Sequence, residues 1–313
     1  MLESLLIVAR QVGILFALMA VGFICNKRKL LNGVAIKGIT ELLVLIVTPS
    51  LIVHVFQRPF DRALLGGLGW AVAAAFFAHV AGSVLALLCV HDPVKRREGV
   101  LRFATIFSNA GFMGIPLEYA ILGPKGVFFG AVYVVMFNLI CWSWGIVVMC
   151  GGMKDVRLRT IFINPGSVGV AIGLPFFLFS LRMPAFIGEP IRMLSDLNTP
   201  LAMIMAGWYL AEADFRPVLR CAGAYIVAVL RLAAVPLAVI GALVAMRVFI
   251  PSLDPVMAVA IATAAAAPTG ALTTVIAAKY DLDVSTATGI VSGTTLLSIL
   301  TMPPIVGFAL WLF

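Results

Sequence analysis

Asn109 begins a short sequence, NAGFMGIP (109–116), whose residue types suit the binding of a solute inside a membrane. The surrounding stretch, 100–122, is apolar enough to cross a bilayer, yet two glycines and a proline interrupt it. Glycine costs about 1 kcal/mol against alanine in a helix interior, and proline about 3 kcal/mol. Broken backbone at membrane depth is tolerated only where protein or a water-filled cavity satisfies the freed amides and carbonyls. We therefore interpret the break as a binding site; the alternative is a kink whose polar groups are satisfied by neighbouring helices.

A second break of the same kind lies in the other half of the chain. Residues 264–271 read AAAAPTGA, again with proline and glycine in the middle of an apolar stretch. Pro116 and Pro268 are 152 residues apart. A second pair of motifs has nearly the same offset, 151 residues: TPSL at 48–51 and TPLA at 199–202. Two pairs at one offset indicate an internal repeat.

The composition around these breaks is that of a polytopic membrane protein. Of the 313 residues, 62% are hydrophobic and 12% are charged, whereas soluble domains carry roughly 25% charged residues. A bilayer core requires about 20 apolar residues per helix. The sequence thus predicts an all-α membrane protein with ten transmembrane helices, at 4–25, 36–56, 64–90, 100–122, 126–150, 165–182, 190–212, 219–249, 255–279 and 285–312.

Five predicted helices fall in each half, and the broken helix is the fourth of each. We expect a first repeat over 1–150, a short cytoplasmic connecting loop at 151–164 and a second repeat over 165–313. An odd number of helices per repeat forces the two repeats to insert in opposite directions. Many secondary transporters are built from such inverted repeats, and their discontinuous helices meet at the membrane midplane to form the substrate site.

The basic residues of the loops predict the orientation of the chain. One side of the membrane receives fourteen of the 22 lysines and arginines and the other side seven, while Arg231 lies within a span. The more basic side is the cytoplasmic one, so both termini are expected on the non-cytoplasmic side. The same bias explains the net charge of +8 without a nucleic-acid partner. We expect an integral protein of a bacterial inner (plasma) membrane.

Four segments resemble motifs of the auxin efflux carrier family, which includes plant PIN-type exporters and bacterial malate or malonate permeases. SNAGFMGIPL (108–117) is similar to the fourth-helix signature of that family, and VTPSLIVHVF (47–56) to its second helix. NTPLAMIMAGWYLA (198–211) resembles its seventh helix. AAAAPTGALTTVIAAKYDLDVSTAT (264–288) resembles its ninth-helix crossing and the start of the tenth. The resemblance covers almost the whole chain.

The resemblance implies a static scaffold bundle and a moving transport bundle that contains an X-shaped crossing of helices 4 and 9. It also implies transport of a small organic anion, and we expect a mono- or dicarboxylate or an auxin-like acid carried by elevator-type alternating access. Asn109 would donate its side-chain amide to the carboxylate. Backbone amides, two threonine hydroxyls and the positive ends of half-helices would assist. The residues predicted to bind substrate are Asn109, Gly111, Gly114, Pro116, Pro268, Thr269, Gly270 and Thr273.

Ionisable residues within or beside the predicted spans are candidates for charge or proton coupling, because charge is costly inside a bilayer. Glu41 lies one turn from the cytoplasmic end of the second span, where a snorkelling structural role explains it equally well. Arg231 is expected either to pair with an acid such as Asp196 or Glu212 or to bind substrate charge. Asp61 resembles the position of one member of an acid–base pair in the family.

The sequence predicts no enzyme active site, cofactor or metal site. GPKG (123–126) lacks the Walker spacing, which argues against ATP hydrolysis. GVFFG (126–130) and GVAIG (169–173) suit close helix packing, and a homodimer is left open. Two other functions are also left open. A sodium-coupled symporter of bile-acid type would need dense oxygen ligands near the crossing, and a membrane sensor with a transporter fold would bind a ligand without moving it.

Overall fold

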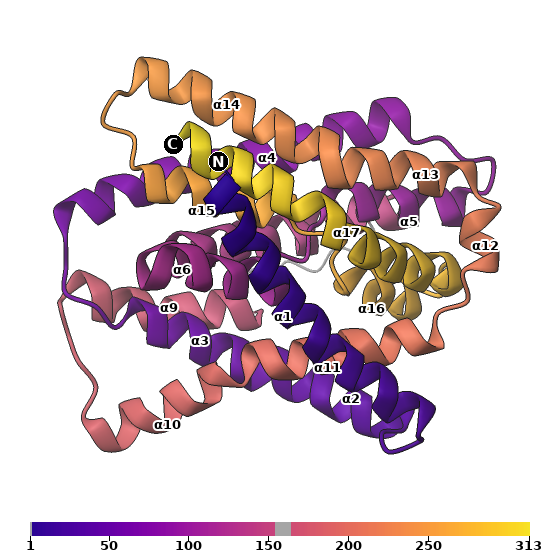
Figure 1. Ribbon diagram of the computed structural model, residues 1–313, viewed down its shortest axis with the longest axis horizontal. Coiled ribbons are helices and arrows are strands. Elements are labelled where there is room, and N and C mark those ends of the chain that lie inside the picture. The colour runs from indigo at the N-terminus through magenta and orange to yellow at the C-terminus, as the bar shows by residue number, and fades with distance from the viewer. Residues whose placement is uncertain (1, 154–163) are drawn as a thin grey trace.

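The computed structural model describes residues 2–153 and 164–313, which form an all-α protein (Figure 1). The predicted connecting loop at 151–164 lies mostly outside the described residues. In chain order the helices are α1 (Leu2–Lys27), α2 (Gly33–Leu42), α3 (Thr48–Phe56), α4 (Arg62–Cys89), α5 (Lys95–Ile106), α6 (Ile115–Ile140), α7 (Ile146–Cys150), α9 (Pro165–Leu178), α10 (Ala185–Asp196), α11 (Asn198–Glu212), α12 (Arg216–Leu219), α13 (Ala222–Val229), α14 (Val235–Phe249), α15 (Pro255–Ala266), α16 (Leu272–Lys279) and α17 (Val284–Leu312).

Short π-helical turns precede or join several of these helices: η1 (Leu43–Val47), η2 (Ala110–Gly114), η3 (Cys141–Gly145) and η5 (Leu230–Ala234). A proline stands at the second position of the helix that follows three of these turns, at Pro49, Pro116 and Pro236. Proline has no backbone N–H, so it removes one bond from the helical ladder. A π-helical turn absorbs the resulting change of register, and such turns are frequent at functional sites.

Six helical segments of the described chain are long and apolar enough to cross a membrane: Leu5–Lys27, Gly33–Phe56, Leu64–Cys89, Ala110–Cys150, Ala222–Phe249 and Val284–Leu312. Together they indicate an integral membrane protein. The segment of 41 residues from Ala110 to Cys150 would be roughly 60 Å long as one straight helix, about twice the thickness of a bilayer core. It is kinked at Gly123, whose φ of 65° and ψ of −160° suit glycine alone. The remaining segments of the ten predicted spans are shorter or broken helices, such as α5 and α15.

The helices pack as two groups, with α1 and α17 running diagonally across the molecule (Figure 1). In that view α2, α3, α9, α10 and α11 occupy the lower part, and α4, α5, α13 and α14 the upper part. α1 packs along both α11 and α17. Its approach to α11 depends on Gly22 and Gly207, because a Cβ atom at either would overlap the backbone of the facing helix. α6 and α15, which carry the two breaks or their continuations, pack against each other.

Candidate functional site

Helices α5 and α15 both end inside the protein, at Ile106 and Ala266. Each is followed by a few non-helical residues and then by a second helix, η2–α6 in one case and α16 in the other. Ser108 and Thr269, one from each interruption, form an isolated antiparallel β-bridge. The two breaks that the sequence relates by a constant offset therefore meet in space.

Two backbone hydrogen bonds hold the interruptions together. The Asn109 N–H donates to the Pro268 carbonyl with an N···O distance of 2.6 Å. The Gly270 N–H donates to the Phe107 carbonyl with a distance of 2.9 Å. We name the two interrupted segments, residues 105–109 and 265–270, the crossing. Each interrupted segment supplies one N–H donor to the other, so part of the backbone freed by the breaks is satisfied without either helix continuing.

Thr269 fastens the crossing to its surroundings. Its hydroxyl donates to the Ala104 carbonyl (3.0 Å), and its N–H donates to the Thr294 hydroxyl oxygen (3.2 Å). We expected amides of Pro268–Gly270 to donate to a substrate, but proline has no N–H, and the other two donors bind protein acceptors here. The backbone donors that remain for a ligand lie at the starts of the two following helices.

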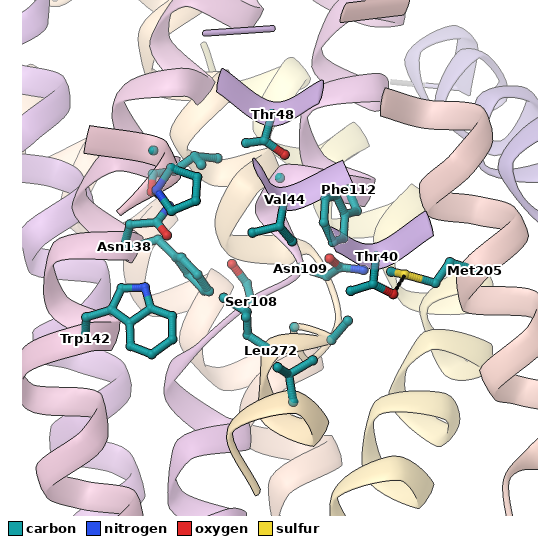
Figure 2. Close-up of a pocket in the computed structure, with 18 of the residues that line it drawn as sticks. Thr40, Val44, Thr48, Ser108, Asn109, Phe112, Asn138, Trp142, Met205 and Leu272 are labelled. Carbon is teal, nitrogen blue, oxygen red and sulfur yellow. Dashed lines mark hydrogen bonds between the residues drawn. The ribbon is translucent and has the colours of Figure 1, made fainter. Parts of the chain in front are cut away.

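A cavity with a volume of about 100 Å³ lies on one side of the crossing (Figure 2). Its lining is mainly apolar, and the described residues that line it include no charged side chain. The helix starts at η2 and α16 contribute Gly111, Phe112, Ala271 and Leu272 to this lining. The N-terminal end of a helix carries a partial positive charge, equivalent to roughly half an elementary charge for a long helix. The cavity therefore combines apolar walls with two electropositive helix starts.

The Asn109 side chain belongs to this cavity and is 7% exposed. It forms no hydrogen bond with any residue that the structure describes, and Figure 2 shows its amide beside Thr40. The Thr40 hydroxyl already contacts the Ile36 carbonyl (2.8 Å) and the Met205 sulfur (2.9 Å). Buried polar groups are normally hydrogen-bonded. An unpaired amide at a cavity wall is thus a group able to bind a ligand.

The structure brings three of the predicted substrate-binding residues into the cavity lining: Asn109, Gly111 and Gly270. Several polar residues outside the predicted set also line it, namely Thr40, Thr48, Ser108, Asn138 and Tyr209. Their only signal in the sequence is a polar group within an apolar span. Many residues of that kind serve other purposes, so the signal is weak.

The remaining predicted residues lie near the cavity but outside its lining. Gly114 faces Ala264 of α15, where a Cβ atom would be in ordinary contact. Pro116 lines a second cavity, of about 490 Å³. Thr273 is fully buried, and its hydroxyl has no hydrogen-bond partner among the described residues.

The second cavity has a different electrostatic character from the first. Its charged lining residues are Arg58, Arg192 and Asp196, and it also includes His54. Arg192 and Asp196 form an ion pair (2.9 Å). Asn198 also lines it, and the Asn198 amide donates to the carbonyl of Gly111, which lines the first cavity (3.2 Å). Asn198 therefore lies between the two cavities. Figure 2 draws only the first of them.

Arg231, on the π-helical turn η5, is fully buried against the crossing. Its guanidinium donates to the carbonyls of Thr105 and Ile106 (3.1 Å each) and to the carbonyl of Ala265. The acids that we expected as partners are bound elsewhere. Asp196 pairs with Arg192, and Glu212 accepts a hydrogen bond from Asn26. The partners of Arg231 are backbone carbonyls, which the sequence could not identify.

The two other coupling candidates lie away from the crossing. Glu41 is exposed near the end of α2. Asp61 lines a shallow depression at the start of α4, with Arg58 and Arg62 beside it. The structure therefore brings neither residue to the first cavity.

Residues 7–157 and 149–306 match a family model whose description is "membrane transport protein". No curated protein matched the chain.

Proposed function

The chain belongs to the membrane transport protein family, which comprises the auxin efflux carrier and PIN-like proteins, and from that premise we propose that it is a secondary carrier of a small organic anion. The substrate would be a mono- or dicarboxylate or an auxin-like acid. It would move by elevator-type alternating access, without ATP hydrolysis. Membrane transport follows from the family, and the substrate class and the mechanism are what we propose.

The observation that carries this proposal is the unpaired Asn109 amide in a cavity bounded by two helix starts. A carboxylate there would accept a hydrogen bond from Asn109 and lie in the positive field of both half-helices. The cavity volume of about 100 Å³ is far below the roughly 300–1,000 Å³ typical of pockets for drug-sized ligands. Its size therefore favours a small acid over a bile acid.

The two cavities support alternating access. The first lies beside the crossing, and the second includes Pro116 and the basic residues Arg58 and Arg192. We propose that the second is the vestibule facing the opposite side of the membrane, where Arg58 attracts an anion, since Arg192 is ion-paired with Asp196 and Glu189. Sliding of the crossing along α3 and α11 would then expose Asn109 to each side in turn.

We further propose that ten spans form two inverted five-helix repeats over 1–150 and 165–313. The antiparallel contact between the two equivalent breaks supports this arrangement. With both termini on the non-cytoplasmic side, single cysteines introduced near each end should react with an impermeant reagent from that side only. Labelling from the cytoplasmic side alone would invert the orientation and exchange the two cavities.

Counterflow in proteoliposomes tests the proposed function. Purified protein is reconstituted with an internal load of malonate, malate or indole-3-acetate, and uptake of the same labelled acid is measured with and without an ionophore. We expect at least one acid to exchange, and Asn109→Asp to abolish the exchange. Saturable binding without flux would instead favour the membrane sensor, and flux that Asn109→Asp leaves intact would place the site elsewhere.

A further inference from the structure

Arg231 binds the one part of the crossing that the substrate site does not use. Thr105 and Ile106 close α5, and Ala265 is one residue from the end of α15. The carbonyls of the last turn of a helix have no partner within the helix. The Arg231 guanidinium, on η5, donates hydrogen bonds to these carbonyls of both helices.

The charges at this place nearly balance. The C-terminal end of a helix carries a partial charge equivalent to roughly −0.5 of an elementary charge. Two such ends meet here, and one guanidinium supplies a single positive charge. No carboxylate of the described residues forms an ion pair with Arg231, so the helix ends are its electrostatic partners.

In secondary transporters with discontinuous helices, the C-terminal ends of half-helices and the unwound carbonyls are where a coupling cation binds. A sodium ion needs such oxygens as ligands. In this protein the carbonyl oxygens of Thr105, Ile106 and Ala265 already accept hydrogen bonds from Arg231.

We propose that Arg231 is a built-in cation that takes the place of a coupling sodium ion at the crossing, so that transport needs no sodium. This inference rests on the proposed function for its consequence in transport, but not for the contacts or for the stability that they provide. Arg231 is a positioning residue, because it holds the two half-helix ends together and does not line the cavity beside Asn109.

The first experiment measures stability and needs no substrate. Thermal unfolding of purified wild type and Arg231→Ala is compared in three buffers of equal ionic strength. One contains sodium chloride, one contains choline chloride, and one contains choline chloride with low-millimolar guanidinium chloride. Wild type should unfold at the same temperature in all three. Arg231→Ala should unfold at a lower temperature and recover part of the loss, saturably, with guanidinium, which can occupy the vacated place.

Arg247→Ala is the matched control, because Arg247 is an exposed arginine of α14 that also donates to a backbone carbonyl, that of Leu312 (2.8 Å). It should show no response to guanidinium. If Arg231→Ala cannot be purified, Arg231→Lys keeps the charge and is expected to fold with a small loss of stability. Two results would overturn the proposal: a saturable stabilisation of wild type by sodium, or an Arg231→Ala protein as stable as wild type and indifferent to guanidinium.

The second experiment measures counterflow of the labelled acid by wild type with sodium replaced by choline. We expect the rate to be unchanged, and a loss of tenfold or more would overturn the proposal. If no acid is moved under any condition, the proposed function fails, and the stability experiment still decides the role of Arg231.

Discussion

The two faces of the crossing show opposite uses of the same helix electrostatics. On the cavity face, two helices begin, and the only side-chain amide of the crossing, that of Asn109, has no hydrogen-bond partner among the described residues. On the other face, α5 and α15 end, and the carbonyls of their last turns bind the buried guanidinium of Arg231. One face is thus left available for an anion, and the other carries a permanent cation.

In the proposed transport cycle, this difference means that only the cavity face has to open. A carbonyl end without a cation would have to be solvated or would bind an ion at each cycle. With Arg231 in place, the negative ends are satisfied in every state that preserves these contacts. The positive ends can then be used for a ligand that arrives and leaves.

The largest effect is expected when a negative charge is introduced on the cavity face. Asn109→Asp keeps almost the same volume but places a carboxylate beside an anionic substrate, so transport should be abolished. Asn109→Ala only removes the donor. A hydrogen bond to a charged group contributes about 1.5–3 kcal/mol, so affinity should fall roughly ten- to a hundredfold.

Both variants are measured by binding and counterflow on folded, monodisperse protein. Asn26→Ala is the control, because Asn26 is a partly buried amide at the end of α1 that donates to Glu212 (2.7 Å) and does not line the cavity. If Asn109→Asp transports the acid as well as wild type does, the anion does not bind at the cavity face.

A smaller loss is expected when the break itself is weakened. Proline opposes helix continuation by about 3 kcal/mol, so Pro268→Ala would allow α15 to extend toward α16. That extension would displace the backbone N–H of Asn109, which donates to the carbonyl of residue 268. Counterflow should fall roughly tenfold or more although Asn109 is present. Pro175→Ala, a proline inside α9, is the control and should retain transport. Unchanged transport by Pro268→Ala would mean that the crossing survives without its proline.

Two neighbouring threonines test how tightly the crossing is held. Thr269→Val replaces the hydroxyl that donates to the Ala104 carbonyl with a methyl group. The buried Ala104 carbonyl then loses this hydrogen bond. The free energy of unfolding should fall by about 1–3 kcal/mol. Thr273→Val removes a buried hydroxyl that has no partner in the described structure, so it should be neutral or slightly stabilising. Chemical denaturation in detergent measures both, and equal losses would contradict the hydrogen-bond assignment.

The sequence allowed prediction of the features that depend on local backbone chemistry. Pro116 and Pro268 revealed the breaks because proline and glycine are poor helix formers wherever they occur. Their contact in space rested on the repeat and on a family resemblance. The partners of Arg231 could not be predicted, because a carbonyl 126 residues away, that of Thr105, has no sequence signal.

The same limit applies to the hydroxyl groups. Thr269 and Thr273 are both threonines close to the second break, and sequence alone made them equal candidates. Only the fold places an acceptor, the Ala104 carbonyl, beside one of them. Tyr209 and Asn138 reach the cavity from other helices, and their positions likewise depend on packing.

The smallest effect concerns the N-terminal end of α5, the helix whose C-terminal end Arg231 binds. Asp92, in the loop before α5, accepts hydrogen bonds from the Arg97 side chain and from the Val94 N–H (2.8 Å each). Burial by itself would raise the pKa of Asp92, but these hydrogen bonds and the charge of Arg97 outweigh it and lower the pKa below its ordinary value. A carboxyl with a lowered pKa stabilises the fold above its unfolded pKa of about 3.9.

That stabilisation is lost as the pH falls through the lower, folded pKa. Unfolding measured from pH 7 down to pH 3, roughly the range that brackets the unfolded pKa, should therefore show a fall in stability below about pH 4. Asp92→Asn should remove this component and cost less than about 1 kcal/mol at neutral pH, because Arg97 is partly exposed and solvent screens the pair. Asp281→Asn is the control, since its carboxylate is fully exposed and lies 3.8 Å from Arg96. If Asp92→Asn keeps the full acid sensitivity of wild type, this carboxylate does not stabilise the start of α5. The face of the crossing that Arg231 binds would then depend on Arg231 and on helix packing.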